Sequence, residues 1–345
     1  MVGVEPRAVR IETSISGGRG VFTIVGLPDA AVRESRERVR AAIRQQGFEF
    51  PRGRVLVNLS PADIPKQGST YDLPIALSIL SAASKPPVSF DTFVAVGELS
   101  LDGEVRPVRT ALGALDVAQR MGRTCLVSHR SSISIDQDLG IAGIASLAEA
   151  VAVAKGTTRA RRVDRARPPE PDPMDMSMVR GQGNARRALE IAAAGGHHLL
   201  LVGSPGAGKT LLARCLPSIL PPLDDVAERE VALIWSTAGL DRASGNRPPF
   251  RAPHHSASLP ALVGGGLGVP TAGEVTKAHR GVLFLDELGV FAPATLDALR
   301  QPLEDGIVTV ARSGGTVRFP ADIQLVASTN PCPCGYLGDH RQPCR

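Results

Sequence analysis

A glycine-rich loop with the sequence GSPGAGKT, residues 203–210, constrains the fold of this chain more than any other feature. It follows the apolar run HLLLV and leads into LLARCL, the strand, loop and helix setting that the pattern G-x-x-x-x-G-K-S/T requires. The backbone N–H groups of such a loop surround phosphate, so a glycine-rich turn without a ligand is the weaker alternative. Lys209 would reach the β- and γ-phosphates, and Thr210 would offer its hydroxyl to Mg²⁺. We therefore assign ATP with Mg²⁺ to the loop residues Gly203, Ser204, Pro205, Gly206, Ala207, Gly208, Lys209 and Thr210.

Polar side chains follow two further apolar runs at the point where each run ends. Asp286 and Glu287 close VLFLDE, and Asn330 follows IQLVAST. The carboxyl ends of parallel strands meet at one edge of a sheet, so all three should face the phosphate loop. Asp286 is predicted to hold Mg²⁺, Glu287 to orient the attacking water, and Asn330 to hold that water or sense the γ-phosphate. With Lys209 they form the predicted catalytic set, although such residues also end ordinary strands and form turns.

The chain is predicted to have three parts. Residues 1–155 alternate strand and helix patterns and read as an α+β domain, with a helix between Pro28 and Gly47, a strand over Arg54–Ser60 and a hairpin within Phe93–Val108. Residues 156–173, GTTRARRVDRARPPEPDP, lack apolar periodicity and form a linker. Residues 174–345 contain three buried-strand candidates with helical segments between them, which indicates an α/β domain with a parallel sheet covered on both faces.

The net charge of +5 is weak support for nucleic-acid binding. Five arginines and one aspartate between residues 159 and 167 supply four of the five charges, and a solvated spacer is favoured there over a nucleic-acid arm. No apolar run reaches the roughly 18 residues of a membrane span. The N-terminal segment MVGVEPRAVRIETS lacks the hydrophobic region of a signal peptide, so we expect a cytoplasmic protein without a membrane segment.

Longer blocks surround these motifs in a fixed order: VRGQ, GSPGAGKTLLARCLPSILPPL, FRAPHHSASLPALVGGG, GVLFLDE, LRQPLEDG and VARSGGTVRFPADIQLVASTNPCPCG. With FTIVGLPDAAVRESRERVRAAI in the first domain, they closely resemble the ComM/YifB-type magnesium chelatase-like AAA+ ATPases of bacteria. The resemblance implies a hexameric ring that couples ATP hydrolysis to movement on DNA, as in branch migration during recombination and natural transformation. It assigns Gln182 of VRGQ to the nucleotide. It also identifies Val308–Phe319 as a hairpin whose Arg312 and Arg318 contact DNA phosphates.

Two other functions stay open at this point. A chelatase-type motor that remodels a protein would share the same ATPase core, and a nucleotide-binding chain without a competent ring would have little activity. In the family that the blocks resemble, a further strand, an arginine finger and a helical lid follow the last segment of this chain. The resemblance therefore implies a C-terminal truncation without the lid, with weak ATP binding and slow hydrolysis.

The first domain resembles the proteolytic domain of Lon proteases. Pro65–Asp72, PKQGSTYD, corresponds to the segment that carries the nucleophilic serine of that family. Thr70 falls at the nucleophile position and Leu112 near the position of the partner lysine, while Ser69 and Lys66 keep the relevant chemistry nearby. We expect a scaffold or interaction module without protease activity.

Three cysteines, Cys332, Cys334 and Cys344, lie close together at the end of the sequence. Three thiols leave one over in any disulfide pairing, and a tetrahedral Zn²⁺ site needs a fourth ligand, such as His340 or a cysteine further along. A C-x-C pair is also tighter than the usual C-x-x-C. Reduced thiols are therefore preferred over Zn²⁺.

Overall fold

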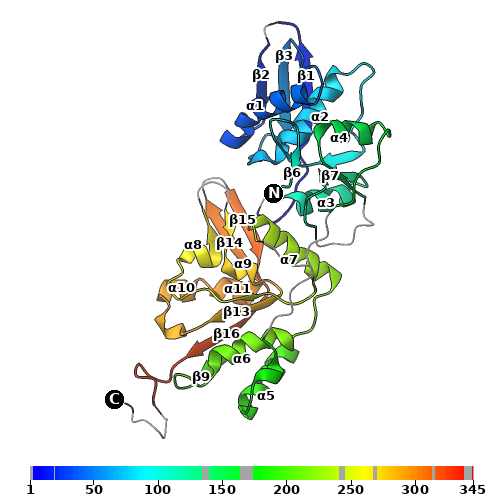
Figure 1. The fold of residues 1–345 in the computed structure, drawn as a ribbon. Helices are drawn as coiled ribbons and strands as arrows, with labels where there is room; N and C mark the ends of the chain where they lie inside the picture. The colour runs from blue at the N-terminus through cyan, green and yellow to red at the C-terminus, as the bar shows by residue number, and fades with distance from the viewer. Residues whose placement is uncertain are drawn as a thin grey trace. The chain divides into compact units, whose positions relative to one another are not determined.

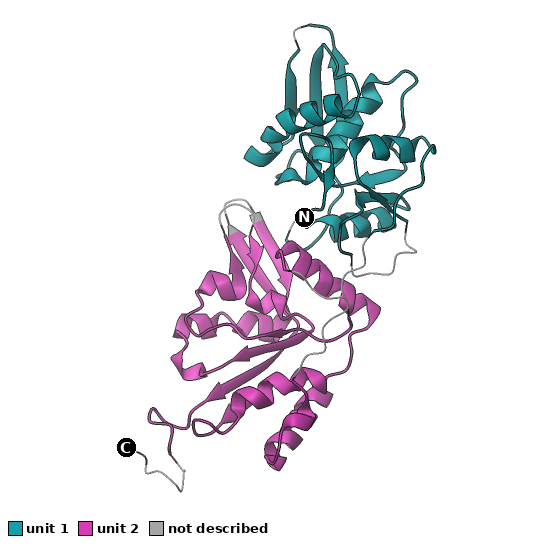
Figure 2. Ribbon diagram, in the orientation of Figure 1, with its two compact units in different colours: residues 1–167 teal, residues 168–345 magenta. Residues whose placement is uncertain are grey.

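The structure is a computed structural model that describes residues 3–18, 20–133, 140–163, 174–240, 245–266, 270–312, 315–337 and 344. The chain forms two compact units, residues 1–167 and 168–345 (Figure 2). This division falls inside the linker expected at 156–173, of which residues 164–173 lie outside the described ranges. Packing of the first unit continues past residue 155, because the backbone of Arg161 exchanges two hydrogen bonds with Gly143 and Val163 is buried.

One sheet of the first unit carries two long helices (Figure 1). β1 (Arg10–Ser16) pairs antiparallel with β3 (Arg54–Ser60), and β2 (Phe22–Val25) pairs parallel with β3. Helices α1 (Ala30–Gln45) and α2 (Asp72–Ala83) pack against each other and share the core beside this sheet. Asp29 caps α1, since its Oδ1 accepts a hydrogen bond of 2.8 Å from the Val32 N–H. The buried positions of α1 recur at helical spacing: Val32, Ser35, Val39, Ala42 and Ile43.

The hairpin expected within Phe93–Val108 is correct only in its second half. β5 (Glu98–Leu99) and β6 (Val105–Arg106) pair antiparallel around Gly103, whose φ of 87° is in the left-handed region. β4 (Phe93–Ala95) instead joins a parallel sheet with β7 (Thr124–Ser128) and β8 (Ile141–Ile144). The chain leaves that sheet at Gly97, where a Cβ would come within 2.7 Å of Val105 Cγ1. The remaining elements of this unit are the 3₁₀ helix η1 (Ser69–Tyr71) and the helices α3 (Ala111–Arg120) and α4 (Leu147–Ala154).

The second unit is built on a parallel sheet with the order β10, β13, β16, β9. These strands span Phe250–Arg251, Gly281–Leu285, Ile323–Thr329 and Leu199–Val202, respectively. β13 is buried along its whole length, as expected for a sheet covered on both faces. β9 differs, because it is one of the two edge strands of this sheet among the described residues and leaves Leu200 and Val202 exposed. The helices and 3₁₀ helices that precede β10 are η2 (Met176–Met178), α5 (Gly183–Gly195), α6 (Lys209–Cys215), η3 (Leu216–Ser218) and α7 (Asp225–Thr237).

Two antiparallel hairpins project from this core. β14 (Ile307–Arg312) and β15 (Gly315–Pro320) form the hairpin that the sequence predicted, and β11 (Gly264–Gly265) pairs with β12 (Thr271–Ala272). Figure 1 places the β14–β15 hairpin and the segment after β16 at opposite ends of the second unit. The other short elements are α8 (Leu259–Val263), α9 (Glu274–Lys277), η4 (Leu288–Val290), α10 (Pro293–Asp297) and α11 (Arg300–Asp305). Among the described residues, every helix is too short or too polar to cross a membrane.

Candidate functional site

The loop between β9 and α6 has the backbone that its glycines allow. Gly206 and Gly208 have φ values of 77° and 84°, in the left-handed region that favours glycine. The ammonium of Lys209 donates to the carbonyl oxygens of Gly203 and Ser204 at 2.7 and 3.0 Å, and to Asn330 Oδ1 at 3.0 Å. The first residue of α6 is thereby joined to the residue that follows β16, across the edge of the sheet.

A second contact joins α6 to the end of β13. Thr210 Oγ1 donates to Asp286 Oδ2 at 2.9 Å. The other carboxylate oxygen of Asp286 accepts a hydrogen bond from Ser328 Oγ, and Ser328 Oγ in turn accepts one from the Glu287 N–H at 3.3 Å. A hydroxyl and a carboxylate so close together are hard oxygen ligands of the kind that Mg²⁺ prefers, so Thr210 and Asp286 fit the ion that the phosphate loop implies.

Ser328 was missed by the sequence interpretation. It is fully buried on β16, two residues before Asn330. The one available signal is a small hydroxyl residue at that position in a strand that already ends at the site. Its contacts orient Asp286 and the backbone of Glu287 together.

A pocket of about 370 Å³ opens beside Thr210 and Asp286. Glu287 has φ of 55°, unusual for a residue with a side chain, and its side chain is 58% exposed. His255 Nδ1 lies 4.0 Å from Glu287 Oε2, and His254 bonds Ser256 through Nδ1 at 2.7 Å. The residues that line the pocket are Thr210, Arg214, Ala252, Pro253, His254, His255, Phe284, Asp286 and Glu287. Arg214 and the two histidines were not predicted to belong to the site.

Gln182 lies against the phosphate loop. Its Nε2 donates to the Ala207 carbonyl at 3.0 Å, and its own backbone is left-handed, with φ of 52°. Pro205, on the same loop, faces Gly335, since a Cβ on Gly335 would come within 2.7 Å of Pro205 Cδ. The assignment of Gln182 to the nucleotide stays a prediction, and the described contact is with the loop.

The hairpin arginines belong to β14 and β15, which lie at the end of the second unit opposite the segment after β16 (Figure 1). Arg318 is exposed on β15 opposite Thr309, and Arg312 stands opposite Gly315 at the last described pair of the hairpin. Their contact with DNA stays a prediction.

The cysteines of the last segment do come together. The Sγ atoms of Cys332, Cys334 and Cys344 all lie within 4.8 Å of one another. The two remaining cysteines are buried elsewhere, and burial raises the pKa of the Cys125 thiol to about 12.

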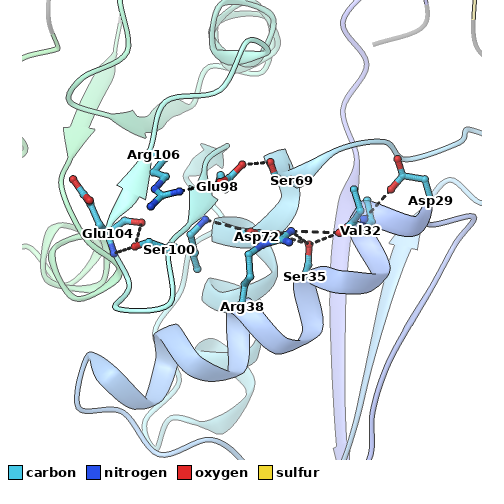
Figure 3. A network of polar contacts seen from close by, with 12 residues as sticks. Asp29, Val32, Ser35, Arg38, Ser69, Asp72, Glu98, Ser100, Glu104 and Arg106 are labelled. Atoms are coloured by element: carbon cyan, nitrogen blue, oxygen red, sulfur yellow. Dashed lines mark hydrogen bonds and ion pairs between the residues drawn. The ribbon is translucent and has the colours of Figure 1, made fainter.

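The polar side chains of the Lon-like segment in the first unit make hydrogen bonds within the fold, and Figure 3 shows that of Ser69. Ser69 Oγ donates to Glu98 Oε2, while Lys66 is fully buried and its ammonium donates to the Pro61 carbonyl. Burial lowers the pKa of Lys66, but its ammonium and the Ser69 hydroxyl donate to different acceptors, the Pro61 carbonyl and Glu98. Thr70 Oγ1 lies 2.6 Å from Thr110 Oγ1.

Leu112, at the position near which a Lon lysine is expected, is buried in α3. No lysine therefore stands at that position to activate the Thr70 hydroxyl.

Comparisons with known proteins cover nearly the whole chain. The family model described as magnesium chelatase, subunit ChlI, matches residues 175–345, and a second model, subunit ChlI of Mg-chelatase, matches residues 11–131. An uncharacterised protein of Mycobacterium tuberculosis is 45% identical over 96% of this chain and 68% of its own length. YifB of Salmonella typhimurium is 42% identical and the competence protein ComM of Haemophilus influenzae 41% identical, each over 99% of this chain and 69% of its own length. Lon protease 2 of Bacillus subtilis is 31% identical over 39% of this chain and 26% of its own length.

Proposed function

This chain belongs to the magnesium chelatase-like ATPase family that includes ComM and YifB, and on that premise we propose that it is an ATP-hydrolysing AAA+ motor of the cytoplasm. The observation that carries the proposal is the meeting of Lys209, Thr210, Asp286 and Asn330 at one sheet edge. Asp286 and Asn330 follow the ends of β13 and β16, and Lys209 and Thr210 begin the helix that follows β9, so all four lie at the edge where α/β folds bind their ligands.

Lys209 is the principal phosphate ligand in this proposal. Three oxygens hold its ammonium within 3.0 Å, and the β- and γ-phosphate oxygens of ATP would replace them with charged acceptors. Thr210 and Asp286 would hold Mg²⁺, which offsets phosphate charge when it is bound. Because Ser328 fixes Asp286, the carboxylate is oriented before the ligand arrives.

Glu287 and Asn330 act on the attacking water in this proposal. Glu287 lines the same pocket as Thr210 and Asp286, so its carboxylate can accept a proton or hydrogen bond from a water beside the γ-phosphate. The Asn330 amide reaches Lys209 from the neighbouring strand and adds no negative charge to the phosphate site.

Two variants separate binding from hydrolysis. Lys209→Ala removes about two charged hydrogen bonds to phosphate, worth about 3 kcal/mol, so the affinity for a fluorescent ATP analogue should fall by roughly 100-fold. Glu287→Gln should bind ATP normally and lose about 10²–10⁴-fold in the rate of phosphate release. Glu304→Gln, an exposed glutamate on α11, is the matched control. Normal turnover by Glu287→Gln would refute the role assigned to this carboxylate.

We further propose that the motor forms a hexameric ring and moves on branched DNA. Support comes from the relatedness to ComM, whose name marks it as a competence protein, and from exposed Arg318 on the projecting hairpin. Forked DNA or a Holliday junction should stimulate the ATPase. Arg312→Ala and Arg318→Ala should each reduce the salt dependence of DNA binding by about one unit of slope, whereas Arg300→Ala on α11 should not.

A chelatase-type role in protein remodelling is the second candidate, because both family models are named for a magnesium chelatase subunit. ATP turnover that is indifferent to every DNA structure would favour it. The first unit serves as a non-proteolytic scaffold under either candidate, since the Ser69 hydroxyl and the Lys66 amine have other hydrogen-bond partners.

A further inference from the structure

Three thiols converge on one point after β16, although the third is ten residues away along the chain. Cys332 Sγ lies 3.2 Å from Cys334 Sγ and 3.6 Å from Cys344 Sγ, and the last two sulfurs are 3.5 Å apart. With a Zn–S bond of about 2.3 Å, neighbouring sulfurs of a tetrahedral site are about 3.8 Å apart. The three sulfurs therefore form a triangle slightly smaller than one face of the sulfur tetrahedron around a zinc ion.

The chemistry of this donor set is selective. Soft thiolates favour Zn²⁺ over hard ions such as Mg²⁺, and three cysteines cannot all be satisfied by disulfides. We propose that Cys332, Cys334 and Cys344 bind one zinc ion as thiolates, each thiol losing its proton on binding. They supply three of the four tetrahedral positions, which leaves one position for a solvent molecule. The C-x-C spacing argued against zinc in the sequence, but the fold brings the distant Cys344 to the pair.

The surroundings of Cys332 fit a thiolate ligand. The Leu337 N–H donates to Cys332 Sγ at 3.3 Å, and the Gly335 N–H donates to the Cys332 carbonyl at 2.9 Å. Backbone N–H groups that donate to a ligand sulfur orient it and stabilise its negative charge. The turn after Cys332 is thus shaped to present its sulfur to a cation.

The proposed zinc site is connected to the phosphate loop through two contacts. Gly335 lies directly against Pro205, and Asn330, two residues before Cys332, accepts a hydrogen bond from Lys209. A bound zinc ion would hold the turn against the loop and keep Asn330 in place. This coupling rests on the proposed nucleotide function, whereas zinc binding itself does not.

The test measures the metal directly. The full 345-residue chain, purified under reducing conditions without added metal, should contain about one zinc per chain by elemental analysis. A mercurial thiol reagent should release that zinc to a colorimetric indicator. Replacement by Co²⁺ should give the thiolate charge-transfer and visible bands of a tetrahedral site.

Matched variants localise the site. The variant with Cys332→Ser and Cys334→Ser should lose the zinc and the cobalt bands, while Cys125→Ala should retain both because its thiol lies in the other unit. Equal zinc in wild type and double variant would refute the site. So would metal-free protein with three freely reactive terminal thiols, or a Cys332–Cys334 disulfide in protein trapped with an alkylating reagent at lysis.

The coupling has its own readout. Removing zinc from the wild type should weaken binding of the fluorescent ATP analogue several-fold, and restoring zinc should reverse the loss. Unchanged affinity would refute the coupling and leave the metal content to decide the site. If wild type bound no ATP at all, the proposed nucleotide function would fail, and elemental analysis would still test zinc.

Discussion

The buried pair of Arg38 and Asp72 provides the sharpest test of the first unit (Figure 3). Asp72 is fully buried at the start of α2, and Arg38 of α1 donates to its two oxygens at 2.7 and 3.1 Å. The hydrogen bond to Asp72 raises the pKa of Arg38. We predict that Arg38→Met destabilises this unit strongly, because it leaves a buried carboxylate without its cation.

The structure sets the magnitude near the low end of the usual range. Removing one partner of a buried ion pair costs about 3–5 kcal/mol. Here the Ser35 hydroxyl and the Leu99 N–H still donate to Asp72, and the Arg38 side chain is 24% exposed, so we expect about 3 kcal/mol. For a unit of this size that corresponds to a fall in Tm of roughly 6–12 °C.

Scanning calorimetry of the full chain measures the effect, with Arg36→Met as control because Arg36 is exposed on the same helix. The only tryptophan, Trp235, lies in the second unit, so its fluorescence transition should stay unchanged. Combining Arg38→Met with Asp72→Asn should cost less than the sum of the two single changes. A Tm for Arg38→Met equal to that of the control, or strict additivity, would refute the reasoning.

Two further predictions concern the second unit. His279 Nδ1 accepts a hydrogen bond from the Asp322 N–H at 3.1 Å, and burial lowers the pKa of His279. The imidazole therefore binds a proton more readily in the unfolded chain than in the folded one. The free energy of unfolding should be at its full value above about pH 6.5 and should fall as the pH drops below it. Urea midpoints followed by tryptophan fluorescence should show this slope, and His279→Gln should flatten it; an unchanged slope would contradict the assignment. Gly335→Ala adds a Cβ at a residue with φ of 84°, within 2.7 Å of Pro205 Cδ. The control Gly306→Ala also places alanine in the left-handed region, but its Cβ meets no atom within 4 Å, so it should cost only the roughly 1–2 kcal/mol of left-handed strain. Gly335→Ala should destabilise the unit by more than this amount. Equal losses in the two variants would show that the close approach to Pro205 is unimportant.

Much of this architecture could be predicted from local sequence. β3, β16 and α1 lie in the segments that periodicity indicated, because short-range patterns determine where strands and helices form. The contact of Lys209 with Asn330 also follows from parallel strands that end at one edge. Motif and topology together were sufficient for that much of the site.

Other features depend on how distant segments pack. Ser328 is an unremarkable strand residue until Asp286 is placed beside it, and Arg214 joins the pocket only through the direction of α6. Cys344 reaches Cys332 through the course of the chain, which spacing alone does not encode. The departure of β4 from the expected hairpin likewise depends on β7, a partner some thirty residues on (Phe93 pairs with Thr124). Each of these required tertiary structure.

The exposed apolar side chains of β9 have a consequence for the chain in concentrated solution. An edge strand presents unpaired backbone donors and acceptors, and here Leu200 and Val202 beside them are 52% and 58% exposed. Such an edge is a template on which another extended segment can add, including the same strand of a second molecule. Self-association of this chain at high concentration would therefore begin at one short strand next to its phosphate loop.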